Sequence, residues 1–218
     1  MQDQIPVKMA RKVTDGPIRN KERTKKKVID ALGNILNKDG FSGLNISKVA
    51  DKAGVDRRLI YDYFGGLEGV VKEYLNAKDY WKINEEDVEG IIASNKHDFG
   101  KTLATDILEK TFDSLMENAE MRRIITWELS EDLQPLKELN QKREKLGEIL
   151  LTEIIDDHFK GKEKNFRAIE AILFSSVYYL TLHAQMNMGP FCGIDLKQAE
   201  GQAELKKTIR QIIDWAYD

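Results

Sequence analysis

The side chains with the clearest chemical potential lie between residues 56 and 63. Arg57 and Arg58 each carry a planar fork of donors that matches the two acceptors on a guanine edge. Neighbouring residues on a helix point in different directions, so we expect at least one arginine to read a base while the other takes a phosphate. Tyr61 suits a thymine methyl group or a phosphate, and its simpler alternative role is packing against the first helix. This combination indicates contact with DNA.

Two short helices must hold these side chains. The sequence predicts one helix over residues 46–53 and a second, outward-facing one over residues 56–64. Gly54 supplies the left-handed backbone that a tight turn needs, and Asp56 can accept hydrogen bonds from the free N–H groups of the second helix. The residues spaced to pack the two helices together are Val49, Ala50, Val55 and Ile60. The pattern is a helix-turn-helix with a basic, aromatic outer face.

Charge is distributed unevenly along the 218 residues. The first 60 residues hold 14 Lys and Arg against 7 Asp and Glu, whereas the remaining 158 hold 20 against 30. The net charge of −3 therefore hides a basic N-terminal segment on an acidic body, and we expect only the first part to meet a polyanion. The apolar fraction of 41% allows a core. The single Cys192 excludes an intrachain disulfide and fits a reducing, cytoplasmic compartment.

The rest of the chain has the apolar spacing of helices, so the sequence predicts an all-α protein. Residues 1–19 lack periodicity and are predicted to be a flexible basic arm, and the first helix is expected from Asn20 to Asp39. Further helices are predicted over residues 67–81, 100–117, 121–129, 135–159, 166–188 and 196–217. The most apolar stretch, residues 171–186, is shorter than a membrane span, and residues 1–20 lack the hydrophobic run of a signal peptide.

A set of short motifs in residues 20–75 keeps a characteristic order and spacing. They are Gly40-Phe41, Ile46-Ser47-Lys48-Val49-Ala50, Ala53-Gly54-Val55, Leu59-Ile60-Tyr61-Asp62-Tyr63-Phe64 and the acidic Glu68. In these the chain resembles the TetR/AcrR family of bacterial transcriptional regulators. The resemblance implies a three-helix DNA-binding domain, here residues 20–66, joined to a larger helical domain, residues 67–218. That domain would bind a small effector and dimerise through its last two long helices.

The resemblance also implies roles for individual residues. Base-edge readers would be Arg57, Arg58 and Tyr61, and phosphate contacts would come from Tyr63, Asn45, Ser47, Lys48, Lys25, Lys26 and Lys27. Two positions depart from the family pattern. Leu67 stands where Lys often meets a phosphate, and Asp56 stands where a small hydroxyl residue is usual. The first removes a backbone anchor, and the second places a carboxylate close to phosphates.

Large apolar residues in the C-terminal part divide into two predicted sets. The dimer surface is predicted to contain Phe174, Val177, Tyr178, Leu182, Leu205, Ile209, Ile212 and Trp215. An effector cavity for an apolar or amphipathic molecule is predicted from Trp81, Phe112, Met116, Trp127, Tyr178, Tyr179, His183 and Met186. The alternative for both sets is that these side chains only fill the core of the monomer, and sequence alone does not separate the uses.

Catalytic and metal-binding patterns are absent from the sequence. Asp156-Asp157-His158 and His97-Asp98 group possible ligands, but consecutive helical residues point in different directions. We find no nucleophile elbow, phosphate loop or dinucleotide fingerprint. The sequence therefore predicts neither an enzyme nor a bound cofactor or metal.

Two functions agree with these features. The first is a ligand-responsive regulator, most simply a repressor, that binds a palindromic operator in double-stranded DNA as a homodimer and releases it when an effector binds. The second keeps the DNA binding, but the C-terminal domain docks a protein partner and senses no small molecule. A cavity-free C-terminal core and a DNA affinity that no ligand changes would favour the second.

Overall fold

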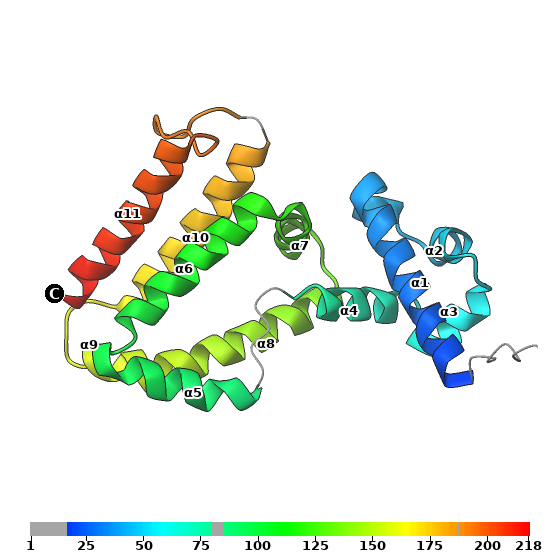
Figure 1. Cartoon of the computed structure of the whole chain (residues 1–218), viewed down its shortest axis with the longest axis horizontal. Coiled ribbons are helices and arrows are strands. Elements are labelled where there is room, and N and C mark those ends of the chain that lie inside the picture. Colours follow the sequence, from blue (N-terminus) through cyan, green and yellow to red (C-terminus); the bar gives the residue numbers. More distant parts are fainter. Residues whose placement is uncertain (1–16, 80–84, 187) are drawn as a thin grey trace, which may run out of the picture. The chain divides into compact units, whose positions relative to one another are not determined.

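The computed structural model describes residues 17–79, 85–186 and 188–218, and these form helices joined by turns (Figure 1). An isolated antiparallel bridge links Phe191 and Ile194 in the turn before the last helix. The all-α expectation is confirmed. The chain divides into two compact units, Met1–Tyr74 and Leu75–Asp218.

The first unit contains α1 (Pro17–Asp39), α2 (Ile46–Ala53), α3 (Arg57–Phe64) and most of α4 (Leu67–Ala77). Its core is the apolar stripe of α1 packed against the inner faces of the shorter helices. The buried side chains are Val28, Ala31, Leu32, Ile35, Leu36, Val49, Ala50, Ile60, Val70, Val71 and Tyr74. The helix-turn-helix predicted from spacing is therefore present, with three of its four predicted packing residues, Val49, Ala50 and Ile60, inside the core and the fourth, Val55, half-buried.

The boundary between the units lies within α4, beyond the division after Gly66 that the sequence suggests. The cause is burial, because Val70 and Tyr74 place their side chains in the core of the first unit. The Tyr74 ring packs on α1 at Gly33, where an added Cβ would lie 2.9 Å from Tyr74 Cε2. The first turns of α4 therefore complete the core of the first unit.

The second unit is a bundle of helices, several of them long. They are α5 (Glu85–Asn95), α6 (Lys101–Glu117), α7 (Ala119–Ser130), α8 (Gln134–Leu150), α9 (Asp156–Phe159), α10 (Phe166–Gln185) and α11 (Ala199–Tyr217). Helix α6 packs against both α10 and α11 (Figure 1). Around Phe112 of α6, Val177 of α10 and Ile209 of α11, the three helices share one apolar core.

Most differences from the predicted elements occur at helix ends. The helix predicted over 135–159 contains a π-helical turn, Leu151–Ile155, between α8 and α9. Helix α10 ends at Gln185 and α11 begins at Ala199, while Leu196 is buried in the turn before α11. Helix α5 was not predicted, because its sequence is acidic and its apolar residues do not form a clear stripe.

A cluster of rings joins the residue before Gly100 and α6, helix α9, the start of α10 and the end of α11. The His158 ring lies 4.8 Å from the Phe99 ring and stacks on Tyr217 at 4.9 Å between centroids. The Tyr217 hydroxyl donates a hydrogen bond to the Phe99 carbonyl at 2.8 Å. These contacts make His158 a packing residue of the bundle.

Gly100 begins α6 in a left-handed conformation with φ of 79°. A Cβ there would lie 2.8 Å from Ile155 Cγ1 and 3.0 Å from Ile154 Cγ2 in the π-helical turn. We expect Gly100→Ala to destabilise the second unit by about 1–3 kcal/mol, because both the backbone and the packing would be strained. Thermal and denaturant unfolding measure this change.

Gly147, in the last turn of α8, provides the control. A Cβ at this position would meet nothing within 4 Å, and the residue has helical backbone. Gly147→Ala is expected to stabilise the protein by about 0.5–1 kcal/mol. Equal effects of the two substitutions would contradict the packing that the structure shows at Gly100.

Candidate nucleic-acid interface

Both helices of the helix-turn-helix begin with a side-chain cap. Asn45 Oδ1 accepts a hydrogen bond from the Lys48 N–H at 2.9 Å, and Asp56 Oδ1 accepts one from the Arg58 N–H at 2.8 Å. Gly54 ends α2 with φ of 65° and allows α3 to begin directly after the turn. These local hydrogen bonds fix where α3 begins. The outward side chains of α3 are therefore held in fixed positions on the surface.

Helix α3 is buried on one face and open on the other. Ile60 is completely buried, while Arg57 and Arg58 are exposed and the side chain of Tyr61 is 56% exposed. Arg58 lies 3.9 Å from Asp62, one turn further on, which is a weak contact between exposed groups. The three predicted base-reading side chains therefore lie on the exposed side of a helix whose other side is locked into the core.

The predicted phosphate-contacting residues lie on three elements of the same unit. Lys48 is exposed on α2, Ser47 is half-buried, and the side-chain oxygen of Asn45 is engaged in capping α2. Tyr63 is half-buried near the end of α3. Leu67, the departure from the family pattern, is half-buried at the start of α4.

The three lysines of the run on α1 differ in exposure and in what they contact. Lys26 and Lys27 are exposed, whereas Lys25 is half-buried with its Nζ 5.7 Å from the centre of the Phe64 ring. Lys21, one turn earlier and not singled out by the sequence, places its Nζ 5.1 Å from the centre of the Tyr63 ring. The available signal was the four-residue spacing of Lys21 and Lys25, which puts both on the face of α1 that meets the end of α3.

The predicted effector residues occupy different environments in the second unit. Phe112 and Trp127 are buried in the core, and Met116, Tyr178 and His183 are half-buried. Tyr179 and Met186 are exposed, and the rings of Tyr179 and His183 pack on Phe191 at 5.4 and 5.3 Å between centroids. Trp81 lies outside the described residues. Of the described members, Phe112, Met116 and Tyr178 belong to one hydrophobic core of the second unit.

The predicted dimer residues separate in a similar way. Val177 and Ile209 are buried within the monomer, and Trp215 is 63% exposed near the end of α11. The remaining five, Phe174, Tyr178, Leu182, Leu205 and Ile212, are half-buried against the same core. Ile172 on α10 is 70% exposed and was not among the predicted residues. Ile172 was not identified because α10 is apolar on nearly every side, and the spacing of apolar residues in such a helix does not show which face is exposed.

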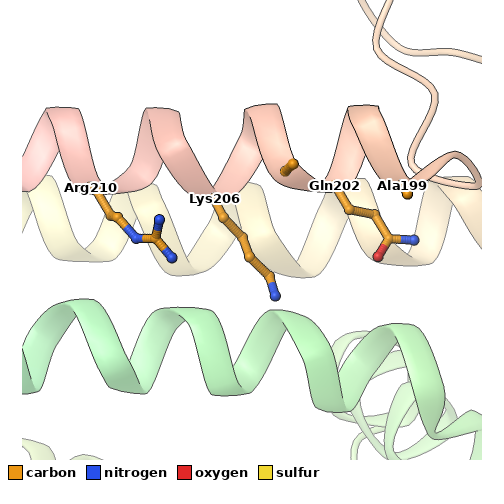
Figure 2. Close-up of a pocket in the computed structure, with 5 residues that line it drawn as sticks. Ala199, Gln202, Lys206 and Arg210 are labelled. Atoms are coloured by element: carbon orange, nitrogen blue, oxygen red, sulfur yellow. The ribbon is translucent and has the colours of Figure 1, made fainter.

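A pocket of about 300 Å³ lies along α11, lined by Ala199, Gln202, Ala203, Lys206 and Arg210 (Figure 2). It contains none of the predicted effector residues. Lys206 pairs with Asp113, and Arg210 pairs with Glu109, both on α6. Both cations are therefore already paired with carboxylates of α6. The pocket is a gap between packed helices and offers no unpaired positive charge from these two residues to a ligand.

Charged side chains also lie inside the second unit. Arg143 of α8 pairs with Glu128 of α7, where Nη1 and Oε1 are 2.6 Å apart, and lies 3.4 Å from Asp79. Burial raises the pKa of Glu128 despite the opposing effect of Arg143. On α10, burial raises the pKa of Tyr178 to about 12, with Arg143 acting against the shift and Glu128 adding to it.

Glu170 of α10 is the most perturbed carboxyl group of this region. Burial raises its pKa from 4.5 to about 7, with Arg167 opposing the shift and Glu144 adding to it. Because the folded protein holds the proton more tightly, the stability from this group is complete below pH 4.5. It is lost as the pH rises from 4.5 to about 7.

We expect Glu170→Gln to stabilise the protein by about 1–3 kcal/mol at pH 8 and by clearly less at pH 5. The amide removes the cost of ionising this half-buried carboxyl group, and that cost grows as the pH rises from 4.5 to about 7 and is complete above it. Thermal unfolding of both proteins at the two pH values measures the difference. Glu163→Gln, at an exposed glutamate, is the control and should show no such pH dependence. A stability difference that is the same at both pH values would contradict the raised pKa.

Comparisons with known proteins agree with this geometry. Residues 28–74 match the model of a family described as bacterial regulatory proteins, tetR family. No curated protein matches the sequence. Within the described residues, no helix combines the length and the apolarity that crossing a membrane requires.

Solved structures with a similar fold come from several bacteria. NalD, the secondary repressor of the MexAB-OprM multidrug efflux pump in Pseudomonas aeruginosa, aligns with a TM-score of 0.62 and 15% identity over 89% of this chain and 96% of that chain. FadR from Bacillus subtilis, in complex with stearoyl-CoA, aligns with a TM-score of 0.55 and 17% identity over 86% and 96%. A TetR family transcription regulator from Marinobacter aquaeolei aligns with a TM-score of 0.57 and 16% identity over 89% and 97%.

The family match covers the same helices that build the exposed face of α3, and the similar structures extend over both units. Residues 28–74, which carry the helix-turn-helix, therefore match the tetR family of bacterial regulatory proteins, and the chain shares its fold with solved structures of such regulators.

Proposed function

We propose that this regulator is a ligand-responsive repressor that binds a palindromic operator as a homodimer. The observation that carries the proposal is the outer face of α3, where Arg57, Arg58 and Tyr61 are exposed on a capped helix. In the major groove a bidentate arginine discriminates guanine by about 1–3 kcal/mol per base pair. Two copies of α3 related by a twofold axis would read two half-sites and require a palindrome.

Exposed apolar side chains support the homodimer. Ile172 and Tyr179 are exposed on α10, and Trp215 is exposed on α11. Large exposed apolar residues gathered on the last two long helices suit a self-complementary surface between two copies. In this proposal Val177 and Ile209 are core residues of the monomer that pack beneath the interface and do not contact the second copy.

One similar protein supports the binding of a ligand, and another supports repression. FadR from Bacillus subtilis was solved in complex with stearoyl-CoA, and NalD is a repressor of a multidrug efflux pump. We infer that an apolar or amphipathic effector binds in the second unit and acts in the cytoplasm, where the operator lies. The effector shifts the protein away from its DNA-binding state only through a difference in affinity for the two states.

The test is to recover and sequence the genomic fragments that the purified full chain binds at about 150 mM salt, where sequence-independent binding is suppressed. We expect one palindromic sequence to be enriched, and we expect a triple variant with Arg57, Arg58 and Tyr61 changed to Ala to lose it. Losing a bidentate contact in each half-site would reduce operator affinity at least about a hundredfold.

Lys26→Ala is the matched control. This exposed lysine on α1 would contact only phosphate, so the variant should bind all DNA more weakly and keep the same preferred sequence. The absence of an enriched sequence with the wild-type protein would contradict the operator. An operator affinity that responds to no ligand would favour a protein-docking role for the second unit.

Two substitutions at Asp56 distinguish its role as the cap of α3 from the effect of its negative charge on DNA binding. Asp56→Asn keeps the cap on the Arg58 N–H and removes a carboxylate from the predicted DNA surface, so it should tighten operator binding without a loss of stability. Asp56→Ala removes the cap and should destabilise the first unit by about 1 kcal/mol. Unfolding and operator titration of both variants measure these effects. Equal operator affinity of wild type and Asp56→Asn at low salt would place Asp56 away from phosphates.

A further inference from the structure

The end of α3 carries no positive charge of its own. Within residues 59–69 the only charged side chains are Asp62 and Glu68, and both are exposed carboxylates. These two groups would repel a DNA strand that passes beside the end of the helix. A phosphate contact at this place therefore needs a cation from another element to offset them.

Helix α1 supplies such a cation. Lys21 precedes the buried Val28 by seven residues, so it lies on the side of α1 that faces the core of the first unit. The apolar residues of this side begin only after Lys21, and the Lys21 side chain is exposed. Its Nζ lies 5.1 Å from the centre of the Tyr63 ring. This cation–π contact holds the ammonium group beside the end of α3.

The Lys21 ammonium and the Tyr63 hydroxyl both remain able to bind a ligand. Among the residues that the structure describes, no carboxylate pairs with Lys21, whereas Lys101 and Lys206 of the second unit each pair with an aspartate. Within the same ranges the Tyr63 hydroxyl has no hydrogen-bond partner. An ammonium beside a hydroxyl suits a phosphate group, because both can donate and the phosphate oxygens accept.

Tyr63 lies where a DNA strand would run. It follows the buried Ile60 by three residues, so it is at the side of α3 and not on the outer face with Arg58 and Tyr61. The Tyr63 ring is half-buried, which limits the positions that its hydroxyl can take. When a recognition helix lies in the major groove, its sides face the sugar–phosphate strands that border the groove.

We propose that Lys21 and Tyr63 bind one phosphate of the operator backbone together, with the ammonium and the hydroxyl on oxygens of the same phosphate. The contact carries no sequence information, but it fixes the register in which the arginines of α3 meet the bases. This inference rests on the proposed function, because it requires α3 to lie in the major groove. It adds to that function a residue of α1 that spacing in the sequence does not single out.

The experiment measures the affinity of the full chain for the recovered operator and for an unrelated duplex of the same length, from about 50 to 200 mM salt. We expect Lys21→Gln to bind both duplexes at least about fivefold more weakly at about 150 mM salt, because each α3 then releases one counterion fewer. The slope of log affinity against log salt should fall by about 1 for each α3 on the DNA. Lys21→Arg keeps the cation and should restore affinity and slope.

Tyr63→Phe keeps the ring beside Lys21 and removes the hydroxyl. This variant should bind more weakly with an unchanged salt slope, because a neutral hydroxyl releases no counterion. If both groups hold one phosphate, the loss of affinity in the double variant, with Lys21→Gln and Tyr63→Phe, should be clearly smaller than the product of the two single losses. Independent losses would multiply.

Lys38→Gln is the matched control. Lys38 is exposed in the last turn of α1, seventeen residues after Lys21 and so about 25 Å along the helix axis. Its charge is farther from the proposed contact than the screening length of about 8 Å at physiological salt, so this variant should keep the wild-type affinity and slope. Thermal unfolding of every variant verifies that the first unit is folded.

The outcomes are distinct. Weaker and less salt-dependent binding in Lys21→Gln, restored by Lys21→Arg and coupled to Tyr63→Phe, supports the shared phosphate. Wild-type affinity and slope in Lys21→Gln overturn it and leave the proposed regulator intact, and so do losses that multiply in the double variant. A wild-type chain that binds neither duplex overturns the proposed function, and the shared phosphate with it.

Discussion

The burial of one face of α3 is the constraint on which the proposed DNA-binding surface depends. A helix of eight residues is far below the length at which an isolated helix is stable in water. It therefore exists only because Ile60 is buried in the core and because Asp56 and Gly65 satisfy its ends. Burial of this face also determines which residues remain exposed. The same packing therefore both stabilises α3 and turns its arginines toward solvent.

The helix-turn-helix was predictable because its signals are local. A left-handed Gly54, the caps at Asn45 and Asp56, and the spacing of Val49, Ala50 and Ile60 each act over a few residues, and all indicate the same structure. The extent of the unit was less predictable. Tyr74 joins its core only through a packing site on α1 at Gly33, far away in the sequence. The sequence pattern of residues 46–64 therefore could not predict the contact between Tyr74 and Gly33, because both residues lie outside that segment.

The second unit shows why its site residues were harder to assign. Helix α10 is apolar on nearly all sides, so Val177 and Tyr179 look equivalent in sequence although one is buried and the other exposed. Only the position of α6 and α11 distinguishes the faces of α10. The Arg143–Glu128–Asp79 network joins residues from three separate segments, and no spacing rule connects them. Long-range pairing of this kind appears only when the helices are packed.

The two ends of α4 are held by different kinds of interaction, and this difference has a physical consequence. Apolar burial of Val70 and Tyr74 is nondirectional and is lost only when the core opens. A largely buried ion pair gains little net stability, since desolvation offsets most of the attraction between its charges. Such a pair is therefore inexpensive to exchange for another charged partner, yet its geometry is specific while it lasts.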